Sequence, residues 1–422
     1  MSEKVIVIHP ELTFIRPGDA NARQVARKPE AALEEAVGLA HAIALNVVHD
    51  EIINLPRITP ATLIGSGSVE RIQPMIGELE AALVFVDYPL TPVQQRNLEK
   101  AWNCKVIDRT GLIIEIFGAR ARTREGQLQV DLAALNFQRS RLVRSWTHLE
   151  RQRGGAGFLG GPGETQIELD RRLIDDKIKK LKTELEDVRK NRKLQRESRK
   201  KEPYPIVAIV GYTNAGKSTL FNRITGAKVF AKDLLFATLD TTMRGIELPS
   251  GKKAILSDTV GFISDLPTHL VAAFRATLEE VQEAAVILHV RDISQPNSEA
   301  ERDERVIEVM NKIDSLDPLE RQAAVTRAAR QERLAAVSAL SGEGLDKLLE
   351  MIDAKVGEDR EIYSVDIDIA DGRAVSWLYR RGEVTERKDE AKQVRLKVAL
   401  DPADADRFKD QFDYKLKKKK KT

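Results

Sequence analysis

A glycine-rich octapeptide at residues 211–218 has the residue types and spacing that bind nucleoside triphosphates. It reads Gly-Tyr-Thr-Asn-Ala-Gly-Lys-Ser, with a strand-like apolar run (206–210) before it and a helical pattern (219–224) after it. Glycines let backbone N–H groups surround phosphates, the lysine reaches the β- and γ-phosphates, and the serine hydroxyl binds Mg²⁺. The phosphate contacts expected from this loop are Gly211, Tyr212, Thr213, Asn214, Ala215, Gly216, Lys217 and Ser218.

A carboxylate motif follows the apolar run 254–257. It reads Asp-Thr-Val-Gly, and an aspartate at a strand end can hold Mg²⁺ through a water while the glycine N–H meets the γ-phosphate. The expected contacts are Asp258, Thr259, Val260 and Gly261.

A third motif predicts that the base is guanine. Residues 311–314 read Asn-Lys-Ile-Asp after the apolar run 306–310. The aspartate can accept hydrogen bonds from N1 and N2 of guanine, whereas adenine offers no such pair, so we expect ATP to be rejected. The expected base contacts are Asn311, Lys312, Ile313 and Asp314, with Ser338, Ala339 and Leu340 bracing the far side.

A segment between the first two motifs must supply a threonine to the metal. Residues 236–242 contain Thr238, Thr241 and Thr242, and the residues alone do not choose among them. A threonine in such a loop is more often structural than a ligand.

The residue after Gly261 is unusual for this chemistry. Ras-like GTPases place a water-orienting glutamine there, and this chain has Phe262. We therefore expect slow intrinsic hydrolysis unless a partner, an ordered backbone or a monovalent cation completes the site. Asn214 either offers an oxygen to such a cation, K⁺, or hydrogen-bonds its own loop.

Composition narrows the class of protein. The chain has 422 residues, 42% hydrophobic and 32% charged, which predicts a soluble protein of several domains. The start of the chain lacks the pattern of a signal peptide, and no run is long enough to span a membrane. Cys104 is the single cysteine, so no internal disulfide forms and a cytoplasmic location fits. The net charge of +3 is too small to identify a partner.

Hydrophobic periodicity divides the chain into four regions: 1–118, 119–203, 204–357 and 358–422. Region one alternates strands with helices, which predicts a small parallel α/β domain. Its expected strands are 5–9, 46–50, 83–87 and 106–108, and its helices 31–45, 69–80 and 92–102. Region two has apolar residues at spacings of three and four on both sides of a glycine-rich tip at 154–163, which predicts an antiparallel helical hairpin.

The remaining regions complete an α/β fold class. Region three predicts a doubly wound P-loop GTPase domain with strands 206–210, 253–257, 286–290, 306–310 and 333–337. Region four predicts a small α+β domain with strands 363–369, 374–379 and 394–400 and a helix near 403–408. The lysine run 417–421 is expected to be a disordered tail.

Several of these stretches resemble the HflX-type GTPases of the Obg–HflX group along the whole chain. The resembling sequences are 108–113, Gly-Pro-Gly-Glu-Thr-Gln at 161–166 with Asp-Arg-Arg at 170–172, the loop 211–218, Phe-Ala-Thr-Leu-Asp at 236–240 and 258–262. The resemblance implies a GTPase that binds the large (50S) ribosomal subunit and splits stalled ribosomes. It also favours Thr238 as the metal ligand, with contacts from Phe236, Ala237, Thr238, Leu239 and Asp240. Mg²⁺ would then be held by Ser218, Thr238 and Asp258, and catalysis would involve Lys217, Thr238 and Gly261.

The distribution of charge supports RNA as a partner. Residues 189–201 hold eight arginines and lysines against one acid, and five arginines line the other hairpin helix: Arg139, Arg141, Arg144, Arg151 and Arg153. Either run alone could be a solvated helix face, but two basic helices beside a glycine tip favour phosphate contact.

Three positions depart from the family pattern. Leu159 and Gly160 stand where relatives often have an arginine at the tip. Residues 65–68, Gly-Ser-Gly-Ser, lack the lysine of an element thought to bind ATP in some relatives, so we predict no second nucleotide site. The connection 291–305 has only fifteen residues, enough for a parallel crossover with about two helical turns.

Three functions compete at this point. The first is a GTPase, expected to be a monomer, that couples hydrolysis to remodelling of ribosomes. The second is an RNA-binding module in which GTP is a conformational ligand and turnover is incidental. The third, an RNA-dependent ATPase, is disfavoured by the guanine motif at 311–314.

Overall fold

The computed structural model describes residues 2–13, 28–152, 162–199, 204–227, 235–236, 242–263, 281–293, 303–357, 361–390, 392–400 and 402–419. The chain divides into two compact units, residues 1–246 with 253–345, and residues 247–252 with 346–422. None of the described helices is both long and apolar enough to span a membrane.

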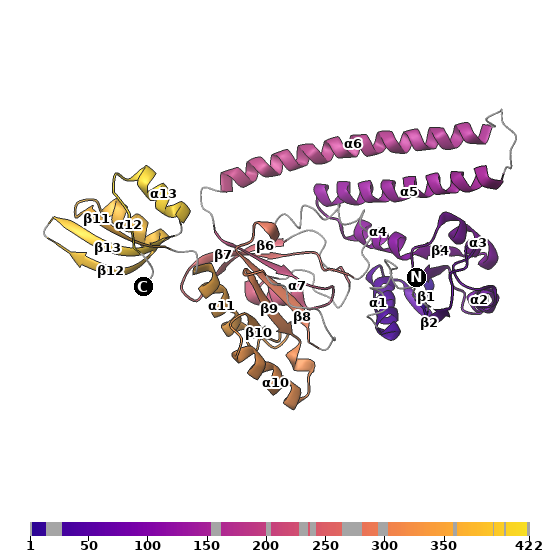
Figure 1. Ribbon diagram of the computed structural model, residues 1–422, viewed down its shortest axis with the longest axis horizontal. Helices are drawn as coiled ribbons and strands as arrows, with labels where there is room; N and C mark the ends of the chain where they lie inside the picture. Colours follow the sequence, from indigo (N-terminus) through magenta and orange to yellow (C-terminus); the bar gives the residue numbers. More distant parts are fainter. Residues whose placement is uncertain are drawn as a thin grey trace. The chain divides into compact units, whose positions relative to one another are not determined.

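The first region is the parallel α/β domain that its sequence predicts (Figure 1). The sheet order is β2-β1-β3-β4, and every pairing is parallel. The strands are β1 (Lys4–Leu12), β2 (Asn46–Leu55), β3 (Leu83–Val86) and β4 (Lys105–Asp108). The helices between them are α1 (Pro29–Ala42), α2 (Ser66–Glu78) and α3 (Pro92–Trp102).

Local signals explain where α3 begins and ends. The Thr91 hydroxyl accepts a hydrogen bond from the Gln94 N–H, and the Gln94 side-chain oxygen accepts one from the Thr91 N–H. Pro92 occupies the first helical turn. The helix ends at Asn103, which has a left-handed backbone.

The hairpin is preceded by a helix that periodicity did not separate. This helix, α4 (Arg109–Arg120), begins at Asp108, whose side chain accepts from the Gly111 N–H, and it buries Leu112, Ile116 and Phe117. The hairpin helices α5 (Arg124–Gln152) and α6 (Pro162–Arg199) lie side by side (Figure 1). Arg124 forms an ion pair with Glu184, and Arg139 forms one with Asp175. Because the later residue of α5 meets the earlier residue of α6, the two helices are antiparallel.

The GTPase region has a sheet in the order β10-β9-β8-β5-β7-β6. The strand pairs β10–β9, β9–β8, β8–β5 and β5–β7 are parallel, as predicted for a doubly wound domain. The strands are β5 (Ile206–Val210), β6 (Thr242–Glu247), β7 (Lys253–Asp258), β8 (Val286–Asp292), β9 (Val306–Asn311) and β10 (Leu334–Ala336). The helices are α7 (Lys217–Thr225), the short 3₁₀ helix η3 (Ile313–Ser315), α10 (Pro318–Ala329) and α11 (Leu345–Gly357).

The short connection 291–305 still joins two adjacent parallel strands, β8 and β9. Its middle, 294–302, lies outside the described residues.

The last region is a β-α-β-β-α-β domain with an antiparallel sheet in the order β12-β13-β11-β14. Its elements are β11 (Glu361–Asp368), α12 (Gly372–Arg381), β12 (Glu383–Asp389), β13 (Gln393–Leu400), α13 (Pro402–Gln411) and β14 (Lys417–Lys419). Both helices share one hydrophobic core with alternate residues of β11 and β13.

Two predictions for this domain were wrong. The segment 374–379 is part of α12, because Ala374, Trp377 and Leu378 are buried at helical spacing and Asp371 caps the first turn. The lysine run is not a tail throughout, because β14 pairs with β11 and Lys418 forms an ion pair with Glu361.

Candidate nucleotide-binding site

The loop 211–218 joins the end of β5 to the start of α7, which is the geometry expected of a phosphate loop. Gly216 has a φ of 89°, and a Cβ there would lie 2.2 Å from Asn311 Nδ2. Only glycine therefore fits between the loop and the strand that carries the base motif.

Lys217, the first residue of α7, is buried. Its Nζ donates a hydrogen bond of 2.6 Å to the carbonyl of Tyr212. Burial lowers the pKa of Lys217 to about 8, and the nearby Asp258 carboxylate opposes that shift. A buried ammonium with this little compensating charge is well suited to receive phosphate oxygens.

Two of the three predicted metal ligands are in contact. The Ser218 hydroxyl donates a 2.8 Å hydrogen bond to Asp258 Oδ2, and Asp258 is fully buried at the end of β7. No group of three His, Cys, Asp or Glu side chains that could hold a metal occurs among the described residues. A hydroxyl and one carboxylate fit Mg²⁺, which usually completes its shell with phosphate oxygens and waters.

The carboxylate motif is hydrogen-bonded to the phosphate loop. The Thr213 N–H donates to the Phe262 carbonyl at 2.7 Å, and the Phe262 N–H donates to the Gly211 carbonyl at 3.0 Å. A Cβ on Gly261 would lie 2.9 Å from the backbone Cα of Thr213, so glycine is needed for this close approach to the phosphate loop. The neighbouring Thr259 hydroxyl donates to the Ile209 carbonyl at 2.6 Å, a structural contact within the sheet.

Asn311 connects the base motif to two other motifs. Its Nδ2 donates to the Ala215 carbonyl at 2.8 Å, and its Oδ1 accepts from the Ala339 N–H at 2.9 Å. Ala215 and Ala339 were both predicted site residues. The Asn311 amide thus joins the phosphate loop, the base motif and the loop 338–340.

The other base-motif residues differ in exposure. Ile313 and Ser338 are buried, and Lys312 forms a 2.7 Å ion pair with Asp292 at the end of β8. Asp314 is exposed in η3, and the Leu340 side chain is 74% exposed. The burial that would make Asp314 selective must therefore come from the nucleotide itself.

The threonine segment is described only at its start. Phe236 is buried against Phe117 of α4, and Leu235 is buried beside it. Ala237, Thr238, Leu239 and Asp240 lie outside the described residues.

One residue that braces the base loop is not predicted from the sequence. Arg223, on the outer side of α7, donates a 2.8 Å hydrogen bond to the Ser341 carbonyl and lies against Gly342. No sequence signal identifies it, because an arginine in the first helix after a phosphate loop belongs to no motif.

Two of the five hairpin arginines have structural partners. Arg139 is paired with Asp175 across the hairpin. Arg141 hydrogen-bonds Gln95, lies 3.7 Å from Asp108 and stacks on the Phe137 ring. Arg141 is mostly buried beside Asp108, whereas the Arg139 side chain is 43% exposed in its ion pair, so phosphate contact by these two arginines stays a prediction.

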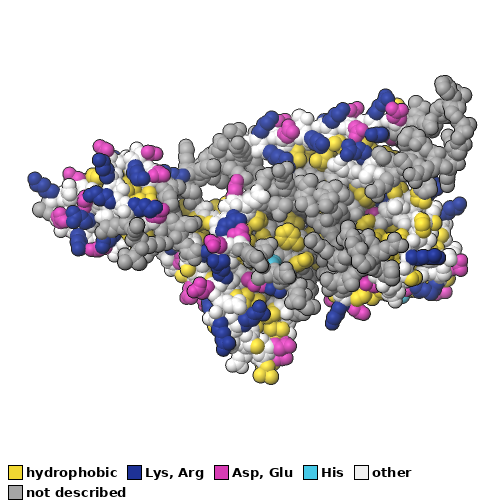
Figure 2. Space-filling model, viewed as in Figure 1, with side chains coloured by type: hydrophobic (Ala, Val, Ile, Leu, Met, Phe, Trp, Pro, Cys, Tyr) yellow, Lys and Arg dark blue, Asp and Glu magenta, His cyan; other side chains and the backbone are white. Residues whose placement is uncertain are grey.

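The rest of the basic hairpin remains a prediction. On the face shown in Figure 2, basic and acidic side chains alternate along α6. The side chains of 143–152 and 191–199 lie outside the described residues, as does the tip.

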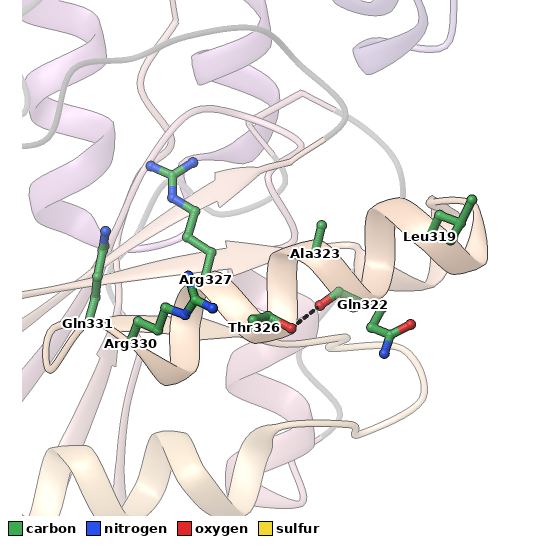
Figure 3. A pocket seen from close by; sticks show the side chains of 7 residues that line it. All are labelled: Leu319, Gln322, Ala323, Thr326, Arg327, Arg330 and Gln331. Carbon is green, nitrogen blue, oxygen red and sulfur yellow. Dashed lines mark hydrogen bonds between the residues drawn. The ribbon is translucent and has the colours of Figure 1, made fainter.

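A pocket of about 580 Å³ lies elsewhere in the GTPase region (Figure 3). Its lining comes only from α10 and the turn after it: Leu319, Gln322, Ala323, Thr326, Arg327, Arg330 and Gln331. None of these belongs to a nucleotide motif, so this hollow is not the nucleotide site.

Comparisons with protein families assign each region in turn. Residues 30–118 match a GTP-binding GTPase N-terminal family, and residues 120–199 match a GTP-binding GTPase middle region. Residues 206–323 match a family described as 50S ribosome-binding GTPase, and residues 323–422 match an HflX C-terminal domain.

Two relatives named GTPase HflX agree with this assignment. A GTPase HflX of Magnetococcus marinus is 50% identical over 384 residues, which cover 88% of each chain. A GTPase HflX of Escherichia coli is 46% identical over 334 residues, 76% of this chain and 77% of that protein. A solved GTP-binding protein of Sulfolobus solfataricus in complex with GDP has 20% identity and a TM-score of 0.44, covering 83% of this chain and 98% of that chain.

Proposed function

Because this chain belongs to the HflX family of GTPases, we propose that it binds the large ribosomal subunit and couples GTP binding and hydrolysis to ribosome dissociation or rescue. The observation that carries this proposal is the match of the nucleotide-binding region to 50S ribosome-binding GTPases, together with the motifs that Asn311 connects. A chain with this role would act in the cytoplasm, and we propose that it acts as a monomer.

We assign the nucleotide contacts as follows. Lys217 and the Gly261 N–H would bind the γ-phosphate oxygens, which Lys217 can do without losing a strong partner, because its present acceptor is a backbone carbonyl. Ser218, Asp258 and Thr238 would hold Mg²⁺, which would neutralise charge on the phosphates. Asp314 would read guanine, with Asn311 and the 338–340 loop fixing the base pocket.

The attacking water needs an orienting group that Phe262 does not supply. Phe262 is 42% exposed and has no side-chain donor or acceptor. We propose that the ribosome completes the site. A bound K⁺ on Asn214, which is exposed with a φ of 61°, is a second source of help. If K⁺ acts there, turnover in K⁺ buffer exceeds turnover in Na⁺ buffer, and Asn214→Ala removes the difference.

Phe262 also favours the alternative function, a nucleotide-gated RNA-binding module with incidental turnover. In that case GTP would change ribosome affinity, but ribosomes would not change the rate of hydrolysis.

The hairpin is the proposed RNA arm, and it can be tested by co-sedimentation with ribosomal subunits. Replacing Arg192, Lys193 and Arg196 with alanine should markedly lower affinity. It should also reduce the slope of log affinity against log salt by roughly one for each phosphate that is no longer neutralised. Basal GTP turnover should persist. The experiment is run with a GTP analogue and with GDP.

The matched control removes charge from the end of the chain. Because Lys417–Lys419 form β14, the control deletes only residues 420–422 and leaves that strand in place. Normal binding by the hairpin variant with loss of binding by the deletion would show that the RNA arm is assigned to the wrong region.

A further inference from the structure

The residue that precedes the turn with Asp314 has an unusual backbone. Lys312 lies between β9 and η3, and its φ of 65° and ψ of 32° are left-handed values that few residues other than glycine adopt. Such a conformation persists only where surrounding contacts determine it. A contact outside the turn must therefore hold Lys312.

That contact comes from the neighbouring strand of the sheet. Lys312 Nζ lies 2.7 Å from Asp292 Oδ2, and Asp292 is the last residue of β8 and the register partner of Asn311. The Asp292 side chain is 10% exposed and the Lys312 side chain 30%, so water screens this ion pair less than a pair on the open surface. The Ile293 N–H also donates to the Asn311 carbonyl at 3.2 Å, which extends the contact between the two strands beyond Asp292.

The backbone of Lys312 in turn determines where Asp314 lies. The Lys312 carbonyl accepts hydrogen bonds from the Ser315 N–H at 3.0 Å and from the Ser315 hydroxyl at 2.6 Å. These two bonds close the 3₁₀ turn whose middle residue is Asp314. Ile313 is fully buried, and its N–H donates to the Val337 carbonyl at 3.4 Å. Because Asp314 itself is exposed, the turn rather than packing of its side chain places its carboxylate.

We propose that Asp292 is a positioning residue for guanine recognition, acting through its ion pair with Lys312 on the turn that carries Asp314. This inference rests on the proposed role of Asp314 in reading the base. A carboxylate distinguishes guanine best when its hydrogen bonds to N1 and N2 are both well aligned. The ion pair supplies that alignment before binding, since it holds Lys312 in the conformation on which the turn depends. The turn then loses less conformational entropy when the nucleotide binds.

The effect should depend on the base and not on the number of phosphates. Asp292→Asn keeps the size of the side chain and removes the charge that pairs with Lys312. It should lower the affinities for GDP and for a non-hydrolysable GTP analogue by the same factor, about three- to tenfold. IDP lacks the 2-amino group and so loses less, which should reduce the ratio of GDP to IDP affinity by about threefold. Single turnover at saturating GTP should keep the wild-type rate, because the phosphate loop is unchanged.

Glu308→Gln provides the matched control. Glu308 of β9 forms an ion pair with Arg291 of β8, so this variant also removes one charge from a pair between the same two strands. It should leave the ratio of GDP to IDP affinity at the wild-type value, whatever it does to the melting temperature. An equal fall of this ratio in Glu308→Gln and Asp292→Asn would show a general loosening of the two strands and would overturn the proposal.

A double-mutant cycle tests the route through Lys312. Lys312→Met removes the other charge of the pair and keeps an unbranched side chain. In a chain that already carries Lys312→Met, Asp292→Asn should have little further effect on the ratio of GDP to IDP affinity, because the contact is already lost. An equal fall with and without Lys312→Met would mean that Asp292 acts by another route, which would also overturn the proposal.

Asp314→Asn, measured beside Asp292→Asn in the full chain, keeps failure of this inference distinct from failure of the proposed function. We expect both variants to discriminate less well against IDP. If Asp314→Asn loses discrimination and Asp292→Asn keeps it, the base assignment stands and the role of Asp292 is wrong. If Asp314→Asn discriminates as the wild type does, the base assignment itself is contradicted and the inference falls with it.

Discussion

The N-terminal domain and the GTPase domain each have a parallel sheet whose strands end in polar residues, but the two edges are built differently. In the N-terminal domain, Asp87 directly follows β3, lies 2.8 Å from His9 of β1 and accepts a hydrogen bond from Arg109 at 2.5 Å. Arg109 also donates to Glu35 at 2.5 Å. These side chains are all nearly buried, and they compensate one another's charge.

At the corresponding edge of the GTPase sheet, the Lys312–Asp292 ion pair lies at the end of β8, whereas the phosphate loop is arranged differently. Lys217 and Asp258 are buried there among glycines and backbone N–H groups, and the Lys217 ammonium donates to a carbonyl. Ligands of α/β sheets bind at this edge in general. Phosphate binding at such an edge would need glycines that leave room and a cation without a full counter-charge, whereas ion pairs fill the edge in the N-terminal domain.

Removing Arg109 from its ion pairs with Asp87 and Glu35 should have the largest effect, a loss of stability. Arg109→Met leaves Asp87 and Glu35 buried without their main counter-charge, which costs about 3–5 kcal/mol in the free energy of unfolding. Chemical denaturation measures this. GDP affinity of the folded fraction should be unchanged.

A matched variant sharpens that test. Adding Asp87→Asn and Glu35→Gln to Arg109→Met removes the two buried carboxylate charges that the single variant leaves without Arg109. The triple variant should recover much of the lost stability. If the triple variant is as unstable as the single one, packing rather than charge holds this edge.

Breaking the phosphate edge should instead affect turnover. Lys217→Ala should lower the GTP hydrolysis rate by about 10²–10³-fold, since one preorganised donor to developing charge is lost. The fold should stay intact, because removing a buried charge that lacks a full partner is not destabilising. Ser218→Ala should impair Mg²⁺-dependent binding in the same assay. Wild-type rates in either variant would refute the assignment of this loop.

Base selection should show a smaller effect. Asp314→Asn should weaken GTP binding by roughly 10- to 100-fold, because the amide presents a donor where guanine also presents one. Equilibrium titration with xanthosine triphosphate serves as the control, since its affinity should rise. Unchanged GTP affinity would mean that Asp314 does not contact the base.

The pH dependence of binding should be the mildest effect. Phosphates favour the charged form of Lys217, so they raise its pKa from about 8, and binding takes up a proton at higher pH. GDP affinity should be flat below about pH 8 and then fall by up to tenfold per pH unit. Lys217→Arg, which stays charged, should remove this decline, whereas a decline of equal slope in that variant would exclude Lys217 as its source.

The sequence predicted which motifs come together better than it predicted their surroundings, and the reason is physical. Phosphate binding depends on local backbone geometry. Consecutive residues such as Gly216, Lys217 and Ser218 are therefore enough to recognise the loop in the sequence. Arg141 and Phe236 depend on partners distant in the chain, Asp108 and Phe117, and nothing in a local pattern specifies those contacts.

The secondary structure predicted from the sequence was wrong where local preferences and tertiary packing conflict. The segment 374–379 is rich in residues that favour strands, yet its burial follows a helix. Lysines such as Lys417 usually mark a solvated tail, but pairing with β11 orders them here.

The most direct test of the central claim is GTP turnover with and without purified large ribosomal subunits. The proposed function predicts slow basal hydrolysis, because Phe262 cannot orient the water, and a clear stimulation that rises with subunit concentration to saturation. Lys217→Ala should show no stimulated turnover. A wild-type rate that is independent of large subunits at every concentration would contradict coupling to the ribosome and leave the nucleotide-gated binding module as the function.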